Sequence, residues 1–388
     1  MNGAALVLLA AAALGVLTLF GELVVIALAR RRPVPRATTT QGLSILKPMC
    51  GVDDGLEHTL EHFARMTGPS VELLLGVKDL EDPAFPIARR VAARFPDTVR
   101  VVPQRGSPVM NPKVNQLITL TKAARFELLM VSDSNAFLAP EALDEIQAHF
   151  EDPRVACVAN PLSGKGHRSF GALLDNLHLA AFVGAGQIAA KVVADRDLVI
   201  GKSMTLRRSV LERLGGFGAF GDYAAEDFAI GQAVRHQGLR TVVAAHPVWN
   251  VAVRRSVKSF FDRYRRWAVL QRTNVSLPTY LGQAFFNPWP LAVLAWVAQP
   301  SIPTTVGLAV ILLLRIALDL GTARVMNLEP IPARAALVVP LKDVLLFLAW
   351  VEALFRRTIL WRGNQLQVAP GGKLVRPAID GLATEGAR

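Results

Sequence analysis

The chain has 388 residues, of which 52% are hydrophobic, and its formal net charge is +12. This length accommodates one large domain with added membrane segments, or two modest domains. The positive charge points to nucleic acid, an anionic membrane surface or a phosphate-bearing substrate as partner. Because no zinc-finger spacing or helix-turn-helix signature occurs, we expect no nucleic-acid partner. The two cysteines, Cys50 and Cys157, form no CxxC motif and provide neither a disulfide nor a metal framework.

The first predicted element is an N-terminal transmembrane anchor within residues 1–30. Residues 4–29 are apolar except for Glu22, and a span needs roughly 20 apolar residues. A cleaved signal peptide is the alternative, but no basic residues begin the chain and the apolar run is too long for such a peptide. The cluster Arg30-Arg31-Arg32 follows directly. Since positively charged segments stay in the cytoplasm, we expect the residues after the anchor to lie on the cytoplasmic face.

Residues 36–255 have the pattern of a soluble α/β domain. Strands are expected at Leu43–Leu46, Val71–Val77, Val99–Val102 and Leu128–Ser132, and helices at Leu56–Met66, Pro86–Phe95 and Lys113–Ala124. Apolar strands that alternate with helices predict a mostly parallel sheet covered on both faces. Ligands bind such sheets beyond the carboxyl ends of the strands. A dinucleotide-binding domain is excluded, because residues 47–53 after the first strand contain no GxGxxG motif.

Two acidic motifs are candidates for chemistry. Asp133-Ser134-Asn135 follows the strand ending at residue 132, where a carboxylate can hold a divalent cation against a diphosphate. Asn135 is a neutral and weaker metal ligand than an aspartate. Glu226-Asp227 begins a helical pattern. Taken alone, each motif is better explained by helix or turn capping, since acidic residues are favourable at helix N-termini.

The segment 256–275 is predicted to be an amphipathic helix in the membrane interface. Its apolar residues recur at helical spacing, and lysine and arginine fill much of the remaining surface. It contains Arg263-Tyr264-Arg265-Arg266-Trp267, in which Arg263 and Arg266 can clamp a diphosphate. Trp267 can stack on a sugar or anchor the helix at the interface.

Further apolar stretches predict more membrane contact. Leu173–Val193 is expected to be either a core helix or a wall that dips into the membrane beside a lipid acceptor. Residues 281–355 contain three apolar stretches, near 281–299, 303–321 and 335–354, and residues 356–388 form a tail. The last stretch contains Lys342, Asp343 and Glu352, so it either spans the membrane or lies at its surface. The side of the C-terminus stays open.

In this order the motifs resemble a known enzyme class. Lys78-Asp79, Asp133-Ser134-Asn135, Glu226-Asp227 and Arg263-x-x-Arg266-Trp267 resemble the D, DxD, D, (Q/R)xxRW series of GT-A family-2-like glycosyltransferases. The finer motifs are similar to the ceramide glucosyltransferase family, which is family-21-like: Leu46-Lys47-Pro48, Gly51-Val52-Asp53, Asp79-x-x-Asp82-Pro83, Asn111-Pro112-Lys113-x-Asn115 and Gly201-Lys202-Ser203-Met204. The resemblance covers roughly residues 43–290.

The resemblance implies an α/β GT-A domain held by N-terminal and C-terminal transmembrane helices in a cell membrane, here expected to be bacterial. It implies inverting transfer of a hexose, with glucose expected, from a UDP-sugar to ceramide or a similar lipid. The implied roles are uridine binding by Asp79, a nucleotide pocket at Lys113 and Asn115, Mg²⁺ or Mn²⁺ at Asp133, a general base at Asp227, and contacts to the diphosphate or sugar by Arg263, Arg266 and Trp267.

Other functions fit the same motifs. The acceptor can be a hopanoid or a diacylglycerol of a bacterial membrane. A processive polysaccharide synthase carries similar motifs, but usually has more spans to form a polymer channel. A membrane scaffold without activity would not need acidic residues at separate strand and helix ends together with RxxRW.

Overall fold

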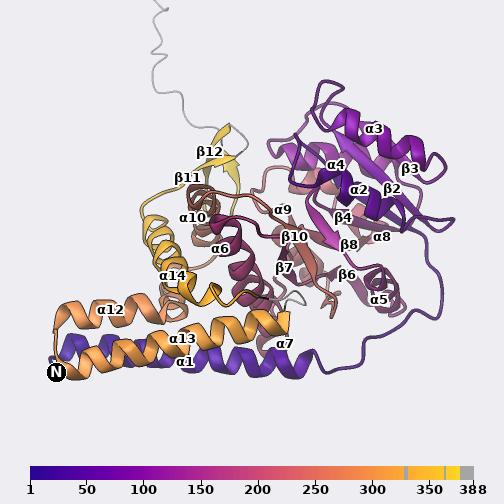
Figure 1. The fold of residues 1–388 in the computed structure, drawn as a ribbon. Helices are drawn as coiled ribbons and strands as arrows, with labels where there is room; N and C mark the ends of the chain where they lie inside the picture. Colours follow the sequence, from indigo (N-terminus) through magenta and orange to yellow (C-terminus); the bar gives the residue numbers. More distant parts are fainter. Residues whose placement is uncertain (327–330, 362–363, 376–388) are drawn as a thin grey trace, which may run out of the picture.

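The computed structural model describes residues 1–326, 331–361 and 364–375. An α/β domain stands on a group of long apolar helices, and a layer of helices lies between the two (Figure 1). The central sheet has seven strands in the order β3-β2-β1-β4-β8-β6-β9. In chain order they are β1 (Leu43–Pro48), β2 (Val71–Val77), β3 (Val99–Pro103), β4 (Leu128–Ser132), β6 (Val155–Ala159), β8 (Ser203–Arg207) and β9 (Arg240–Val243).

The sheet is mostly parallel, as the sequence predicts. Strand β1 pairs in parallel with β2 and β4, β2 with β3, and β6 with β9, whereas β8 is antiparallel to β4 and β6. Successive residues of β1 point to opposite faces: Leu43 and Ile45 join one core, and Leu46 joins the other. Because both faces of the central strands are buried, β1, β2 and β4 are mostly apolar and do not alternate between apolar and polar residues.

Helices cover both faces of the sheet. The first core contains α2 (Leu56–Ala64), α3 (Phe85–Arg94) and α5 (Glu141–His149), and the second contains α4 (Pro112–Ala123), α8 (Arg208–Arg213) and α9 (Glu226–His236). The expected strands and helices of residues 43–132 all occur. The helix ends differ by a few residues from the expected ones, the usual uncertainty of helix boundaries.

The other strands that the structure describes form two small sheets. Strands β5 (Ala136–Leu138), β10 (Val248–Val251) and β7 (Leu162–Lys165) form one three-stranded sheet, and β11 (Thr358–Trp361), β12 (Asn364–Val368) and β13 (Leu374–Val375) form another. The last sheet attaches to the domain ahead of α9, because Ala224 donates a hydrogen bond to the carbonyl of Gly372 over 2.9 Å.

Within the residues that the structure describes, three helices are long and apolar enough to cross a membrane: α1 (Gly3–Ala29), the helical stretch 170–194 and α13 (Ile302–Met326). Helices α1 and α13 lie side by side with the shorter α12 (Pro288–Ala298) (Figure 1). Of the three apolar stretches expected in residues 281–355, the described residues therefore form one helix of spanning length, α13. A short α11 (Leu277–Gly282) and a 3₁₀ turn (Gln283–Phe286) precede α12.

The third apolar stretch forms α14 (Ala335–Glu352), which carries buried charges toward α13. Arg315 of α13 binds Asp343 at 2.7 Å and Asp319 at 2.8 Å, and Lys342 binds Asp319 at 3.0 Å. Lys342 and Asp343 are also paired, at 3.2 Å. Two cations therefore face two anions, which is the arrangement that makes buried charges tolerable. We call these four residues the helix-pair network.

A helical layer connects the domain to the membrane helices. It consists of α6 (Phe170–His178), a π-helical turn (Leu179–Gly184), α7 (Ala185–Ala194) and α10 (Val257–Asn274). Helix α10 packs against α6 and α14, and its Phe260 and Tyr264 are buried in the main core. The apolar face expected to lie on lipid is therefore largely occupied by protein contacts.

Candidate active site

A cavity of about 1990 Å³ opens beyond the carboxyl ends of β1, β2 and β4. At its polar end lie Lys78, Lys113, Asp133, Lys202 and Asp227. It continues past α10 and α7 to α1, where its wall is Thr18, Gly21, Glu22, Val25, Gly186 and Val193. One continuous space thus joins the polar strand ends to the membrane helices.

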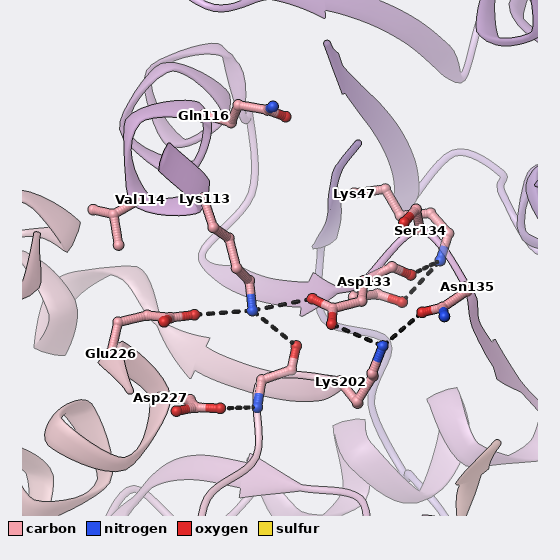
Figure 2. A network of polar contacts seen from close by, with 12 residues as sticks. Lys47, Lys113, Val114, Gln116, Asp133, Ser134, Asn135, Lys202, Glu226 and Asp227 are labelled. Atoms are coloured by element: carbon pink, nitrogen blue, oxygen red, sulfur yellow. Dashed lines mark hydrogen bonds and ion pairs between the residues drawn. The ribbon is translucent and has the colours of Figure 1, made fainter. Parts of the chain in front are cut away.

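Two lysines bind the carboxylate of Asp133 from opposite sides (Figure 2). The Nζ of Lys113 lies 3.0 Å from Oδ1, and the Nζ of Lys202 lies 3.0 Å from Oδ2. Lys113 also pairs with Glu226 at 2.9 Å, and Lys202 donates to Asn135 Oδ1 over 2.6 Å. We call Lys113, Asp133, Lys202, Glu226 and Asp227 the polar cluster. Burial tends to raise the pKa of Asp133, but Lys113 and Lys202 hold it well below its usual range.

Lys113 has its position because of the local sequence. Asn111 caps α4, accepting from the backbone N–H of Lys113 over 3.0 Å, and Pro112 supplies the fixed φ of the first helical turn. The Asn111 amide also donates to Glu226 over 3.1 Å, which fixes the distance between α4 and α9. Burial tends to lower the pKa of Lys113, but the carboxylates of Asp133, Glu226 and Asp227 raise it above its usual value.

Asp227 lies in the first turn of α9 and lines the cavity. Its carboxylate accepts hydrogen bonds from the backbone N–H groups of Gly201 and, over 2.8 Å, Phe228. Burial, and then the adjacent charge of Glu226, raise its pKa from 3.8 to about 6. A Cβ on Gly201 would lie 2.6 Å from Lys113 Nζ and 3.1 Å from Asp227 Oδ2, so a side chain at this position would displace the Lys113 ammonium group. The site thus contains a carboxylate whose pKa suits proton removal near neutral pH.

A third lysine fixes the turn that carries Asp133. Lys47 of β1 is fully buried, and its Nζ donates to Ser132 Oγ at 3.0 Å and to the carbonyls of Asp133 at 2.8 Å and Ala136 at 3.2 Å (Figure 2). Burial lowers the pKa of Lys47 well below its usual value. On the other side of the turn, Ser134 donates to Asp53. The DxN turn is therefore held by side chains from the first strand and the loop after it.

The side chains around Asp133 do not fit a cation held by protein ligands alone. They supply one carboxylate and the amide of Asn135, and ammonium groups already occupy both carboxylate oxygens. In residues 1–326, 331–361 and 364–375, no group of three or more His, Cys, Asp or Glu could hold a metal ion. Mg²⁺ and Mn²⁺ favour carboxylate and water oxygens. The two ammonium groups, each 3.0 Å from an Asp133 oxygen, would repel such an ion.

Of the residues expected to bind the nucleotide, Asn115 lines the cavity and Asp79 does not. Asn115 is buried and lines the cavity, and its amide holds the preceding loop through Val109, over 3.1 Å and 3.0 Å. Of the described residues at the end of β2, Lys78 lines the cavity whereas Asp79 does not. Asp79 is exposed and accepts from the N–H of Glu81. The uridine role of Asp79 stays a prediction.

The RxxRW residues all line the cavity, but Arg263 already has a partner. Its Nη1 lies 2.8 Å from Asp175 of α6, which also accepts from Tyr264 at 2.8 Å and pairs with Arg255 at 3.3 Å. The Arg263 guanidinium stacks over Trp267, 5.0 Å from the ring centroid. Clamping a diphosphate would require Arg263 to share its charge with Asp175. Arg266 lines the cavity from the same helix.

Sequence reasoning assigned no role to Lys202, Glu226 or Asp175, although each belongs to the site or supports it. Lys202 was visible within the motif Gly201-Lys202-Ser203-Met204, and Glu226 stands beside the expected base. Asp175 gave a weaker signal, as an acidic residue inside the apolar stretch Leu173–Val193. A charge in an apolar helix usually needs a partner, but the sequence does not say that the partner is Arg263.

Comparison with known proteins agrees with the motifs. The model of glycosyl transferase family 21 matches residues 5–374. Ceramide glucosyltransferase 1 of Caenorhabditis elegans is 31% identical over 60% of this chain and 50% of its own length, so this chain spans half of that relative. Ceramide glucosyltransferase 3 of the same organism is 25% identical over 89% of this chain and 76% of its own.

A solved structure shares the fold. A mannosyltransferase from Pyrobaculum calidifontis, in complex with GDP-Man and Mn²⁺, superposes with a TM-score of 0.53 and 19% identity, over 90% of this chain and 99% of that one. The likeness supports a GT-A fold with its mixed, mostly parallel sheet. The nucleotide-sugar and the Mn²⁺ are properties of that mannosyltransferase.

Proposed function

Because the chain belongs to glycosyl transferase family 21, we propose that it transfers a hexose from a UDP-sugar to ceramide or a similar membrane lipid, with inversion. Glycosyl transfer is the activity of the family. The relatives named ceramide glucosyltransferase support the choice of sugar and lipid. Glucose is therefore the first sugar to test.

The observation that carries this proposal is the continuous cavity. Its polar end carries lysines and carboxylates suited to a sugar diphosphate, and its other end is walled by α1 and by α7, which belongs to the apolar helical stretch 170–194; α1 and that stretch are both long enough to span a membrane. A water-soluble acceptor needs no such apolar wall. A lipid can enter between the membrane helices and present its hydroxyl at the polar end.

The reaction needs one base and a way to stabilise the leaving group. In our proposal, Asp227 takes the proton of the lipid hydroxyl, and the oxygen attacks the anomeric carbon while the bond to the diphosphate breaks. A single displacement on the face opposite the leaving group inverts the configuration. The pKa of about 6 leaves Asp227 mostly ionised at pH 7, ready to accept the proton.

The departing UDP gains negative charge, which Lys113 and Lys202 can neutralise by turning from Asp133 to the diphosphate. Both ammonium groups already lie in the cavity, so a change of side-chain rotamer on donor binding brings their charge to the diphosphate before the chemical step, where it can stabilise the transition state. Arg266 adds positive charge from α10. Because the donor set around Asp133 does not fit a resident cation, the proposal includes no step that depends on Mg²⁺ or Mn²⁺.

The side of the membrane follows from charge. Arg30, Arg31 and Arg32 directly follow α1, and the Arg30 guanidinium donates to the carbonyl of Ala245 in the α/β domain over 3.0 Å. Since positive residues favour the inside, we propose that the catalytic domain faces the cytoplasm. Cysteines introduced at exposed positions of residues 36–255 should then resist impermeant maleimide in intact cells. Labelling from outside would overturn this orientation.

The test of function is a transfer assay with the purified full chain in lipid vesicles. Labelled UDP-glucose, UDP-galactose and UDP-N-acetylglucosamine are each offered with ceramide, a hopanoid alcohol or diacylglycerol, and the products are identified by mass spectrometry. We expect a monoglycosylated ceramide. Sugar transfer only to a hopanoid or to diacylglycerol would identify that lipid as the acceptor in place of ceramide. A growing polymer would identify a processive synthase instead.

A further inference from the structure

Glu22 is the one acidic residue of α1, and it lines the membrane end of the cavity. Among the described residues it makes no hydrogen bond and no ion pair; its interaction is the longer-range attraction of Arg315. The other acids of the membrane helices behave differently, because Asp319 and Asp343 are both paired at 3.0 Å or less. An ionisable residue in a membrane helix that faces a cavity without a partner marks a functional site.

A second polar group without a hydrogen-bond partner for one of its atoms lines the same cavity. His178, at the end of α6, lines the cavity and is only 6% exposed, and its Nδ1 has no hydrogen-bond partner. Its ring is fixed by aromatic contacts, stacking on Phe182 at 5.1 Å and meeting the Tyr264 ring edge-on at 4.5 Å. Both Glu22 and His178 lie within electrostatic reach of Arg315. A buried nitrogen without a partner costs free energy unless a ligand supplies one.

The depth of Glu22 matches the polar part of a lipid. It lies seven residues before Ala29, the last residue of α1, which is about 10 Å along the helix axis. The headgroup zone of one leaflet is about 5–7 Å thick, so with Ala29 placed at its outer edge, Glu22 comes just inside the level of the headgroups. At that depth a lipid carries the hydroxyl or amide groups that join its head to its tails. The α7 backbone approaches closely here, since a Cβ on Gly186 would lie 3.8 Å from Glu22 Oε1.

We propose that Glu22 and His178 form a subsite for the lipid acceptor, which binds a second hydrogen-bonding group next to the reacting hydroxyl. The Glu22 carboxyl accepts from a hydroxyl or amide N–H, and His178 Nδ1 pairs with a neighbouring oxygen or N–H. This inference rests on the proposed lipid glycosyl transfer and narrows the acceptor class. The enzyme selects lipids whose heads carry at least two hydrogen-bonding groups, over lipids with one hydroxyl.

Two probes separate these acceptor classes: N-hexanoylsphingosine, which carries an amide and a second hydroxyl, and hexadecanol, which carries one hydroxyl. Binding of each to the full chain in detergent is measured by native mass spectrometry, without any sugar donor. We expect the wild type to bind N-hexanoylsphingosine at least about 10-fold more tightly than hexadecanol, since a hydrogen bond to a charged group stabilises binding by about that factor or more. The preference ratio is the Kd of hexadecanol divided by that of N-hexanoylsphingosine. Glu22→Leu should bring this ratio close to one.

Thr18 provides the matched control. It lines the same cavity one helical turn earlier, but its hydroxyl is already bonded to the Leu14 carbonyl at 2.9 Å, so Thr18→Val should keep the ratio. His178→Phe keeps the ring stacking and should lower the ratio as Glu22→Leu does. Unchanged UDP binding by calorimetry shows that each variant is folded.

The inference is overturned if the wild type binds both probes alike, if Glu22→Leu keeps the preference, or if it weakens both probes equally. Because the assay measures lipid binding and not transfer, its result is separate from that of the proposed function. Glycosylated ceramide with no Glu22-dependent preference rejects the subsite alone. Preference for N-hexanoylsphingosine without transfer rejects the activity alone.

Discussion

The protein contains two groups of buried charges that look alike in composition and differ in arrangement. The helix-pair network of α13 and α14 has two cations and two anions, each within 3.2 Å of an opposite charge. The polar cluster has two lysines against three carboxylates, and Asp227 is held by backbone N–H groups instead of an ion pair. The charges of the helix-pair network are therefore balanced. The polar cluster has one more carboxylate than it has lysines, and the pKa of Asp227 is raised.

This difference separates buried charges that stabilise the fold from buried charges that can take part in binding and chemistry. A balanced network has its charges compensated before any ligand arrives, so it joins helices. An unbalanced cluster that lines a cavity keeps groups able to exchange partners when substrate binds. Perturbed pKa values tend to gather at functional sites for this reason. The following predictions test whether the two groups are different in this way.

The largest effect is expected for Asp227→Asn. The amide oxygen can still accept the N–H of Gly201, so the fold and UDP binding should persist while proton removal is lost. We expect kcat to fall by about 10²–10⁴-fold, the usual contribution of a general base. Product formation under saturating donor and acceptor measures the change, and calorimetry with UDP checks binding. Near-normal turnover would transfer the role of base to Glu226.

A substitution in the helix-pair network should lower the stability of the protein. Asp319→Asn removes the acid that lies 2.8 Å from Arg315 and 3.0 Å from Lys342, leaving excess positive charge buried. We expect the free energy of unfolding to fall by about 3 kcal/mol or more. Thermal unfolding in detergent measures it, with activity retained at temperatures where the variant is folded.

The matched control for this variant is Asp262→Asn on α10. Asp262 pairs with Lys258, whose side chain is 84% exposed, and with the partly exposed Arg265 at 3.2 Å, so the change should cost about 1 kcal/mol or less. Equal destabilisation by the two variants would contradict the distinction between buried and exposed pairs.

A smaller effect is expected for Lys202→Met. If Lys202 neutralises the diphosphate, the variant should bind UDP about 10- to 100-fold more weakly, the range for hydrogen bonds to charged groups. Calorimetry in EDTA, and again with Mg²⁺ or Mn²⁺, measures it. Lys122→Met, on the exposed end of α4, is the control and should bind normally. Loss of wild-type UDP binding in EDTA would show instead that a cation carries the diphosphate.

The smallest effect concerns pH. Because the pKa of Asp227 is raised to about 6, activity should be full above that pH and lost as the pH falls through it and the carboxylate takes a proton. Glu226→Gln removes the repulsion that contributes to this rise, so the acidic limb of the kcat/KM profile should move to lower pH. A limb near pH 4 in the wild type would contradict the environment described for Asp227.

Much of this protein could be predicted from the sequence, because the decisive signals are local. The apolar run of α1, the alternation of strands and helices in residues 43–132, and the acids that end β4 and begin α9 each depend on a few consecutive residues. Periodicity and capping act over such distances, so these elements form as expected. The order of motifs also identified the family, although no single motif did.

Tertiary structure alone decided which charges meet. The approach of Lys202 to Asp133, of Arg263 to Asp175 and of Lys342 to Asp319 joins residues 23 to 88 positions apart. It also decided that α10 turns its apolar face to α6 and α14, and that Glu22 lines a cavity with no hydrogen bond or ion pair to any residue in the described parts of the chain. Hydrophobic patterning is indifferent to which polar groups face each other, whereas electrostatic interactions depend on distances of a few ångströms, which only the packed helices and strands determine.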